Sequence, residues 1–357
     1  MPASVRCEQV TLAPYTTLRL GGPARRFLEV GDTDELVAAV TAADRDGEPL
    51  LVLGGGSNLV IADAGFDGTV VHVSTRGRDA VPESDGRVRV RVRAGEEWDP
   101  FVARCVADGL SGIECLSGIP GLVGSTPIQN VGAYGQEVAQ TITEVRALDR
   151  RTGHIDTLDH AACAFTYRNS VFKGTDRYVV LDVTFALRAS GLSAPIRYAE
   201  LARTLGVEPG DSVPVEEART AVLGLRRGKG MVLDPDDPDT RSAGSFFTNP
   251  ILSADAFAAL ERRVAERHGP GVEFPRYPEP DGRLKTSAAW LIERAGFTKG
   301  YARGPVRIST KHTLALTNPG QARTADLLGL AREVRDGVHA AFGVGLVNEP
   351  VFIGVSL

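Results

Sequence analysis

Two glycine-rich stretches of the sequence carry backbone amides at a spacing that suits a phosphate-containing ligand. The first, LGGGSNLVI, offers five adjacent candidates: Gly54, Gly55, Gly56, Ser57 and Asn58. Closely spaced amides in such a turn form a nest for anions, and a pyrophosphate would fit it. A tight turn between two strands is the alternative interpretation. The stretch is neither a dinucleotide-binding fingerprint nor a P-loop, because Leu59 replaces the third glycine and no Gly-Lys-Ser/Thr follows.

The second stretch, residues 115–135, reads CLSGIPGLVGSTPIQNVGAYG and is too rich in glycine to form a regular element. Its apolar residues argue against disorder, so a loop that wraps a ligand is the better interpretation. Two such loops can clamp an extended cofactor from both sides. The pair therefore favours ligand binding over a turn at each site.

Two further side chains could take part in chemistry. Ser245, in AGSFFTNP, places a hydroxyl between Gly244 and two phenylalanines. Capping of a turn by the serine, with the phenylalanines as ordinary core, is the structural alternative. Arg168, in TYRNS, has the planar fork of donors that suits a carboxylate. A surface ion pair is the alternative for this arginine.

The elements that must position these residues follow from local patterns. Asp32 as N-cap and Gly47 as stop predict a helix between strands at RFLEV and PLLVL, and Asp99 is the expected N-cap of a second helix. The alternation in RVRVRVRAG predicts a strand with one buried and one solvated face. A hairpin over EVRALDRRTGHIDTLD and a strand over RYVVLDVTFALR follow. Further helices are expected at 253–268, 287–295 and 321–342, with a β segment between the last two.

Composition bounds the class of protein. A chain of 357 residues fits two or three domains. The formal charge of −5 argues against a nucleic-acid partner. The N-terminal residues lack the apolar core of a signal peptide and no later run is long enough to span a bilayer, so we expect a cytoplasmic protein. The four cysteines show no metal-ligand spacing, so neither disulfides nor zinc are expected: Cys7, Cys105, Cys115 and Cys163.

Five motifs in order resemble the UDP-N-acetylenolpyruvoylglucosamine reductase family, the flavoenzymes of peptidoglycan precursor synthesis. They are LGGGSNLVI, SGIPGLVGSTPIQNVGAYGQEV, FTYRNSVFK, AGSFFTNP and NEPVFIG, and together they span about residues 18–353. The resemblance implies an α+β fold: an FAD-binding fold of the vanillyl-alcohol-oxidase type with two α+β subdomains, plus a C-terminal α+β substrate domain. The implied division is 1–74 with the strand 349–357, then 75–208, then 209–348.

The implied activity is that of an oxidoreductase, in which NADPH supplies hydride through non-covalent FAD to UDP-N-acetylglucosamine enolpyruvate, giving UDP-N-acetylmuramate. The resemblance implies that Arg168 and Glu349 stabilise the charge that develops on the substrate carboxylate and that Ser245 protonates the α-carbon. A carboxylate at Glu349 would have to be protonated or paired to do so. Lys229 is a candidate to tune Ser245 or to bind substrate.

The resemblance also carries over the binding residues. For FAD these are the five residues of the first glycine stretch together with Ile119, Pro120, Gly124, Ser125, Thr126, Gln129 and Gly132. For the sugar nucleotide they are Tyr134, Tyr198, Lys229, Asn249, Tyr277, Lys285, Lys299 and His312. Tyrosine and lysine side chains suit a uridine ring and a diphosphate. No metal ion, nucleic acid or membrane is expected as a partner, and the chain is expected to be a monomer.

Two other functions fit parts of the pattern. A flavin oxidase or dehydrogenase for another small molecule would share the fold, although such oxidases often tether FAD through a histidine that LGGGSNLVI lacks. A nucleotide-binding protein without catalysis would not need the set of Arg168, Ser245 and Glu349. Stopped-flow absorbance of the flavin, with NADPH and then with the enolpyruvyl sugar nucleotide, separates these functions.

Overall fold

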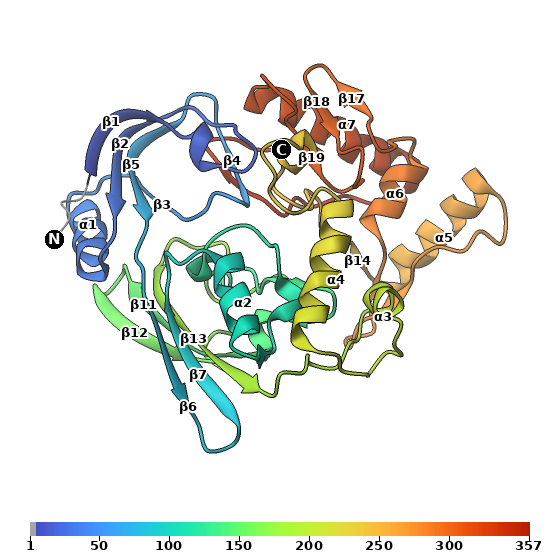
Figure 1. Ribbon diagram of the computed structural model, residues 1–357. Coiled ribbons are helices and arrows are strands. Elements are labelled where there is room, and N and C mark those ends of the chain that lie inside the picture. The colour runs from blue at the N-terminus through green and yellow to red at the C-terminus, as the bar shows by residue number, and fades with distance from the viewer. Residues whose placement is uncertain (1–4) are drawn as a thin grey trace. The chain divides into compact units, whose positions relative to one another are not determined.

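The structure of the chain is a computed structural model that describes residues 5–357 (Figure 1). Its contacts divide the chain into two compact units. Within the described residues, unit 1 comprises 5–10, 24–56 and 66–228, and unit 2 comprises 11–23, 57–65 and 229–357. Both units are therefore built from segments far apart in the sequence. The three-part division expected from the family remains a prediction.

One sheet of unit 1 has four strands in the order β1-β2-β5-β3: β1 (Val5–Thr11), β2 (Pro23–Val30), β5 (Phe66–Val73) and β3 (Leu50–Leu53). β5 runs parallel to both β2 and β3. Helix α1 (Thr33–Arg45) connects β2 to β3 and lies beside this sheet (Figure 1). Asp32 is the N-cap of this helix, as predicted, because its side chain accepts hydrogen bonds from Asp34 N and Glu35 N at 2.8 and 3.3 Å.

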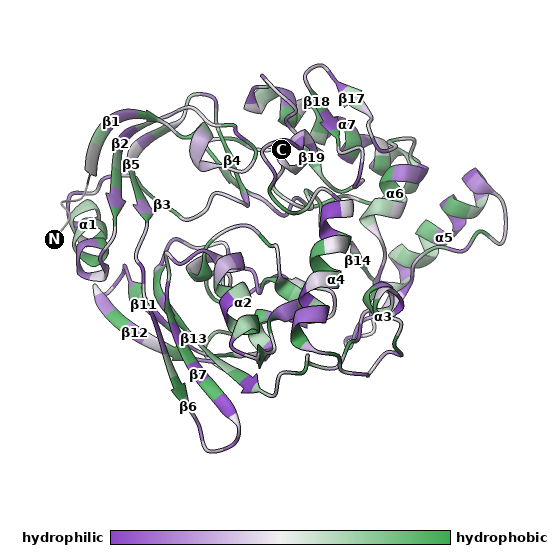
Figure 2. Ribbon diagram, viewed as in Figure 1, coloured by the Kyte–Doolittle hydropathy of each residue, from purple (hydrophilic) through white to green (hydrophobic). Residues whose placement is uncertain are grey.

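The second sheet of unit 1 is antiparallel, in the order β12-β11-β13-β7-β6, with β8 also on β13. Its strands are β6 (Arg78–Pro82), β7 (Arg87–Arg93), β8 (Leu110–Ser111), β11 (Ile142–Asp149), β12 (His154–Asp159) and β13 (Tyr178–Ala189). The predicted alternation of β7 is confirmed, because Val90 and Val92 are fully buried while its arginines are exposed or half-buried. Figure 2 shows hydrophilic and hydrophobic segments following one another along this strand. The predicted hairpin forms from β11 and β12.

Three helices complete unit 1: α2 (Trp98–Ala107), α3 (Ala199–Leu205) and α4 (Val215–Gly228). Between them the chain forms short 3-10 turns and two-residue strands: η2 (Glu114–Leu116), η3 (Val123–Ser125), β9 (Gly132–Ala133), β10 (Gln136–Glu137) and η4 (Val138–Gln140). One apolar core joins both sheets, since Val71 of β5, Trp98 and Phe185 of β13 belong to the same buried cluster.

Asp99 is not an N-cap, which corrects the prediction. Helix α2 begins at Trp98, one residue before Asp99, after Glu97 as N-cap. The carboxylate of Asp99 instead accepts from Gly118 N at 2.6 Å and from both Nη atoms of Arg219, at 2.7 and 3.0 Å. A cationic fork from another helix binds the aspartate more strongly than an amide of its own turn does.

Unit 2 holds the three predicted C-terminal helices as α5 (Ala254–His268), α6 (Ala288–Arg294) and α7 (Thr324–Phe342). Its strands are short: β4 (Leu59–Ile61), β14 (Ile251–Leu252), β15 (Tyr277–Pro278), β16 (Leu284–Lys285), β17 (Ala302–Arg303), β18 (Val306–Ile308), β19 (Leu316–Thr317) and β20 (Val351–Ile353). Two 3-10 turns are η1 (Ala13–Tyr15) and η5 (Pro238–Thr240). The buried face of α7 includes Leu327, Val334 and Val338.

The segment that follows the first glycine stretch belongs to unit 2 and is bound there at two places. β4 pairs in parallel with β20 near the end of the chain. Asp63, just after β4, accepts from Thr324 N and Ala325 N at 2.7 and 3.1 Å and so caps α7. These contacts fix the course of the chain on the C-terminal side of Asn58.

Candidate functional site

The two glycine stretches touch each other within unit 1. A Cβ atom on Gly55 would lie 2.7 Å from Gly121 Cα, and one on Gly54 would lie 2.7 Å from Ser125 Oγ. The neighbour of Gly55 is a backbone atom, so only a residue without a side chain permits this approach, whereas the neighbour of Gly54 is a side-chain oxygen. Among residues 5–357, the amides of Gly54, Gly55 and Gly56 donate to no acceptor, and Gly56 is buried. Buried amides are normally paired, so the amide of Gly56 keeps a hydrogen-bonding capacity that an anion in this turn would satisfy.

The second stretch is held against the segment that leads into α2. Gly121 O accepts from Trp98 N at 3.0 Å, and Gly124 N donates to Ala94 O at 2.9 Å. A Cβ on Gly124 would lie 2.5 Å from Ala94 Cβ, so a larger residue cannot stand there. The loop is thus fixed by backbone bonds and close packing, which preorganises it for a ligand.

Asp99 anchors the start of this loop through Gly118 N. Burial by itself would raise the pKa of Asp99, but the bonds from Arg219 and Gly118 outweigh it and hold this pKa below its ordinary value. Nearby, Arg226 of α4 is buried and its Nη2 lies 3.4 Å from Gly118 O. Burial lowers the pKa of Arg226 to about 10, which leaves the guanidinium charged at neutral pH. A buried positive charge therefore stands beside the loop.

Arg168 lies in a tight turn in which Thr166 and Asn169 exchange backbone hydrogen bonds of 3.0 and 3.2 Å. Its φ is +52°, as at the third position of a type II turn, where glycine or asparagine is normally found. Its Nη2 donates to Gly132 O at 2.7 Å and its Nη1 lies 3.4 Å from Asn130 O. The guanidinium is therefore oriented by carbonyl groups of the second stretch, in a strained backbone conformation.

Tyr134 and Tyr198 meet in unit 1, edge to face, with ring centroids 5.4 Å apart. Glu114 connects their segments: its fully buried Oε1 accepts from Gln136 Nε2 at 2.9 Å and from Ala194 N at 2.7 Å. Tyr198 is 44% exposed and precedes α3. The contact brings together two of the residues expected to bind the sugar nucleotide.

Ser245 and Glu349 come together in unit 2. Phe246, the neighbour of Ser245, donates from N to Leu314 O at 2.7 Å and accepts at O from Glu349 N at 2.9 Å. Asn58 joins them, because its Nδ2 lies 3.4 Å from Glu349 O. Phe246 and Phe247 are buried, so they fix the backbone of the serine from within the core. Glu349 is half-buried and lies two residues before the start of β20.

The turn at Ser245 does not use this serine as a cap. Gly244, with φ +72°, donates from N to Ser242 Oγ at 3.2 Å, so Ser242 has the capping role. Within the described part of the chain, Ser245 Oγ makes no hydrogen bond, and the residue is only partly buried. The hydroxyl of Ser245 is thus held on a fixed backbone and remains available for a ligand.

Four of the other expected binding residues of unit 2 fall into three places. Tyr277 and Lys285 pair across the β15–β16 ribbon, where Lys285 Nζ lies 2.6 Å from Glu279 Oε1. Asn249 Oδ1 accepts from Ala288 N at 3.0 Å, at the start of α6. His312 lies in the loop that contains Leu314 and is thus near Phe246. Two lysines lie elsewhere: Lys299 is exposed after α6, and Lys229 begins the last of the three segments of unit 2.

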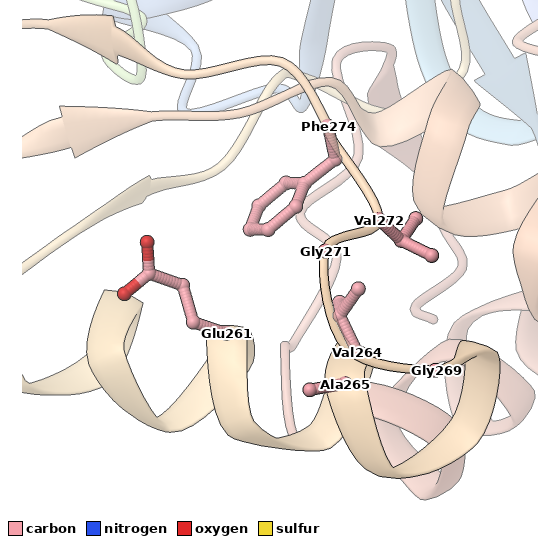
Figure 3. A pocket seen from close by; sticks show the side chains of 7 residues that line it. All are labelled: Glu261, Val264, Ala265, Gly269, Gly271, Val272 and Phe274. Atoms are coloured by element: carbon pink, nitrogen blue, oxygen red, sulfur yellow. The ribbon is translucent and has the colours of Figure 1, made fainter.

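A cavity of about 200 Å³ lies beside α5 in unit 2 (Figure 3). Its lining includes the side chains of Val264, Val272 and Phe274. Glu261, its acidic lining residue, pairs with Arg276 at 2.5 Å. No residue expected to bind FAD or the sugar nucleotide lines this cavity.

Three cysteines are buried free thiols and Cys7 is exposed. Burial raises the pKa of Cys105 and of Cys163 to about 12 and also raises that of Cys115. Over residues 5–357, no cluster of His, Cys, Asp and Glu has the makings of a metal site. None of the helices in that range has the length and apolar character needed to cross a bilayer.

Sequence reasoning missed Asn130, Glu114 and Asp99 at this site. Asn130 was identifiable from one signal only, because asparagine tolerates positive φ in a glycine-rich loop and its φ is +46°. Glu114 and Asp99 carry no local signal, since their partners lie far along the chain.

Comparisons with known proteins agree along the whole chain. Residues 24–159 match the family described as FAD binding domain, and residues 236–353 match the family described as UDP-N-acetylenolpyruvoylglucosamine reductase, C-terminal domain. A protein named UDP-N-acetylenolpyruvoylglucosamine reductase from Thermobifida fusca is 67% identical over 350 residues, 98% of each chain. One of the same name from Streptomyces coelicolor is 64% identical, covering 97% of this chain and 90% of the other.

A solved structure is also similar throughout. It is described as the crystal structure of UDP-N-acetylenolpyruvylglucosamine reductase (MurB) from Thermus caldophilus. The two chains share 26% sequence identity with a TM-score of 0.65, and the match covers 98% of both.

Proposed function

Because the chain belongs to the UDP-N-acetylenolpyruvoylglucosamine reductase family, we propose that it reduces UDP-N-acetylglucosamine enolpyruvate to UDP-N-acetylmuramate in peptidoglycan precursor synthesis. NADPH is the hydride donor and FAD the bound carrier. The observation that supports this most directly is the contact of the two glycine stretches, with three amides that have no acceptor in the described chain.

The FAD site is proposed to consist of these two stretches. When bound, FAD takes hydride from NADPH and passes it to the β-carbon of the substrate. The amides of residues 54–56 suit the pyrophosphate, and Ser57 and Asn58 continue the first stretch. The second stretch contributes Ile119, Pro120, Gly124, Ser125, Thr126, Gln129 and Gly132. Neither stretch contains a histidine, which supports non-covalent binding.

Arg168 is proposed to bind the substrate carboxylate. Addition of hydride to the β-carbon leaves negative charge on the carboxylate oxygens, and preorganised donors in a dry site stabilise such charge by several kcal/mol. The carbonyls of Gly132 and Asn130 hold the guanidinium in place before the substrate arrives. The fold therefore orients the guanidinium of Arg168 before the reaction, and little reorientation is needed to reach the transition state.

Ser245 is proposed to donate the proton to the α-carbon of the substrate. Glu349 is proposed to act, with Arg168, at the oxygens of the substrate carboxylate. The serine is suited to this role because its hydroxyl has no partner in the described chain and its backbone is fixed by two buried phenylalanines. Glu349 N donates to the carbonyl oxygen of Phe246, the residue after Ser245, so this backbone hydrogen bond holds the segments of the acid and the serine together. A carboxyl group near developing anionic charge assists only if it is protonated or paired with a cation.

The sugar nucleotide is proposed to bind to Tyr134, Tyr198, Lys229, Asn249, Tyr277, Lys285, Lys299 and His312. The edge-to-face pair of Tyr134 and Tyr198 and the ribbon pair of Tyr277 and Lys285 support two parts of this set. We also propose that the enzyme is a cytoplasmic monomer. Its chain is proposed to form three domains: residues 1–74 together with 349–357, residues 75–208 and residues 209–348. The free thiols fit a reducing compartment.

The test separates the two half-reactions. Ser245→Ala should be reduced by NADPH at nearly the wild-type rate, because that step needs no proton on a substrate carbon. Reoxidation by the enolpyruvyl substrate should slow by roughly 10²–10⁴-fold, the usual contribution of a positioned acid. Stopped-flow absorbance of the flavin follows both steps.

Ser242→Ala is the matched control. It removes the hydroxyl that caps the same turn, through Gly244 N, but leaves Ser245 Oγ in place. If the turn alone matters, Ser242→Ala should slow reoxidation as much as Ser245→Ala does. That result would eliminate Ser245 as the proton donor. Wild-type flavin that is not reoxidised by the substrate would reject the proposed function itself.

A further inference from the structure

We propose that Asn130 is the positioning residue for Arg168: it holds the strained turn that presents the guanidinium and restrains a neighbouring carboxylate that would otherwise occupy it. The inference rests on the proposed role of Arg168 as the carboxylate clamp. Asn130 does not itself contact substrate in this proposal. It acts through three bonded neighbours, all within unit 1.

The side chain of Asn130 is fully used and buried. The residue is 1% exposed. Its Nδ2 donates to Glu137 Oε2 at 2.9 Å and to Thr166 O at 3.0 Å, and its Oδ1 accepts from Ala139 N at 3.1 Å. A buried amide with all these bonds made has one allowed orientation, and loss of one partner leaves the others unpaired.

Two of these side-chain bonds, to Thr166 and Glu137, bear on Arg168, and so does the backbone carbonyl of Asn130. Thr166 is the first residue of the turn, and its carbonyl accepts both from Asn169 N and from Asn130 Nδ2. The backbone carbonyl of Asn130 lies 3.4 Å from Arg168 Nη1. The side chain of Asn130 thus holds the first residue of the turn, and its backbone carbonyl holds the guanidinium of Arg168. A non-glycine residue with φ +52° persists only where the surroundings impose it, and these contacts are such surroundings.

The bond to Glu137 has a second effect. Glu137 Oε1 lies 3.9 Å from Arg168 Nη1, at the limit of an ion pair, while its other oxygen is held by Asn130. A carboxylate released from Asn130 could move toward the arginine and form the bidentate pair that guanidinium and carboxylate favour. The internal acid would then compete with the carboxylate of the substrate. Asn130 therefore restrains Glu137 from competing with the substrate carboxylate for Arg168.

The experiment uses Asn130→Gly in the FAD-loaded enzyme. Glycine keeps the positive φ but removes all three side-chain bonds, so the backbone of the loop is not strained by the change. Flavin reduction by NADPH should stay within about threefold of wild type. Reoxidation by the enolpyruvyl substrate should fall roughly 10²-fold, the scale of a misplaced group at a reacting centre. Hydrogen exchange should increase at the amides of Thr166 and Asn169.

A matched control lies in unit 2. Asn318 is also 1% exposed and makes three side-chain bonds, to Leu18 O, Gly320 N and Ala322 N, at 3.0 to 3.2 Å. Asn318→Ala should reduce stability without separating the two half-reactions and without increasing exchange at the Arg168 turn. Equal effects of the two variants on both half-reactions would overturn the proposal.

A double-mutant cycle separates positioning from general loss of structure. In an Arg168→Lys background, the fork that Asn130 orients is already gone, so Asn130→Gly should have little further effect on reoxidation. Fully additive effects would overturn the proposal.

Asn130→Asp is the second variant. Aspartate has the size of asparagine and tolerates positive φ, but as a carboxylate it cannot donate to Thr166 O, so reduction should again be preserved and reoxidation slowed. Failure of both variants to fold would replace the positioning role by a purely structural one. Wild-type enzyme that is inactive on the substrate would instead reject the proposed function, whatever the exchange data show.

Discussion

Gly55→Ala is expected to weaken FAD binding because it forces the two glycine stretches apart. The new Cβ would lie 2.7 Å from Gly121 Cα and 3.2 Å from Gly121 C, whereas ordinary contacts of this kind begin at 3.4 Å. Both opposing atoms belong to the backbone, so no side-chain rotation relieves the contact. The φ of Gly55 lies outside the left-handed region, so the effect is one of space and not of backbone preference.

The size of the effect follows from that overlap. Overpacking of a close contact costs about 1–3 kcal/mol. If the cost falls on the ligand-bound arrangement of the loops, the dissociation constant of FAD should rise roughly 5–150-fold. Gly54→Ala should have a smaller effect, because its Cβ would meet the side-chain oxygen Ser125 Oγ, which can rotate away.

The assay is titration of the apoprotein with FAD, followed by quenching of flavin fluorescence. Gly224→Ala is the matched control in unit 1, because Gly224 lies inside α4 and a Cβ there would meet open space. That variant should gain up to about 1 kcal/mol of helix stability and bind FAD as wild type does. Wild-type affinity in Gly55→Ala would refute the argument that the close approach of the two stretches builds the FAD site.

Three further predictions concern protonation, thiols and a cap. Because the pKa of Asp99 is held below its ordinary value, its contribution to stability is complete above about pH 4 and is lost as the pH falls toward the folded-state value. The difference in unfolding free energy between wild type and Asp99→Asn should therefore be constant at higher pH and shrink below pH 4; a difference that grows on acidification would contradict this sign. A thiol reagent should modify only Cys7 in the native protein and all four cysteines after unfolding in the absence of reductant, since burial raises the pKa of the other three; a fast second thiol in the native state would disagree. Asp63→Ala should lower the unfolding free energy by about 1–2 kcal/mol through loss of the cap on α7, and urea unfolding that is unchanged would show that water replaces the carboxylate at no cost.

Elements with a strong local pattern were predictable from the sequence. Asp32 and Gly47 set the limits of α1, and the Arg/Val alternation of β7 follows from one wet and one buried face. The C-terminal helices also agree, because their apolar stripes repeat at the helical period. In each case the information lies within about 20 residues of chain.

Residues whose role depends on distant partners were not predictable in this way. Asp99 looks like an N-cap when read locally, but Arg219, 120 positions later, takes its carboxylate. The pairing of β4 with β20 joins residues 59–61 to residues 351–353, and no local pattern indicates it. Local sequence patterns predict whether a segment is a helix or a strand, whereas the candidate site depends on contacts between elements that are far apart in the sequence.

The strained residues show why the site in particular escapes local rules. Six non-glycine residues have positive φ over residues 5–357, and three of them are Asn130, Tyr134 and Arg168. Each of these conformations costs about 1 kcal/mol or more for an ordinary side chain, so three in neighbouring loops would not persist without compensation. The bonds of Asn130 to Thr166 and of Arg168 to Gly132 supply it, and they also orient the groups proposed to meet the substrate. Replacing Arg168 by glycine or by alanine removes the same guanidinium, but only glycine relaxes the turn. If strain is stored at this site for orientation, the glycine variant should be the more stable of the two, and both should lose reoxidation by substrate.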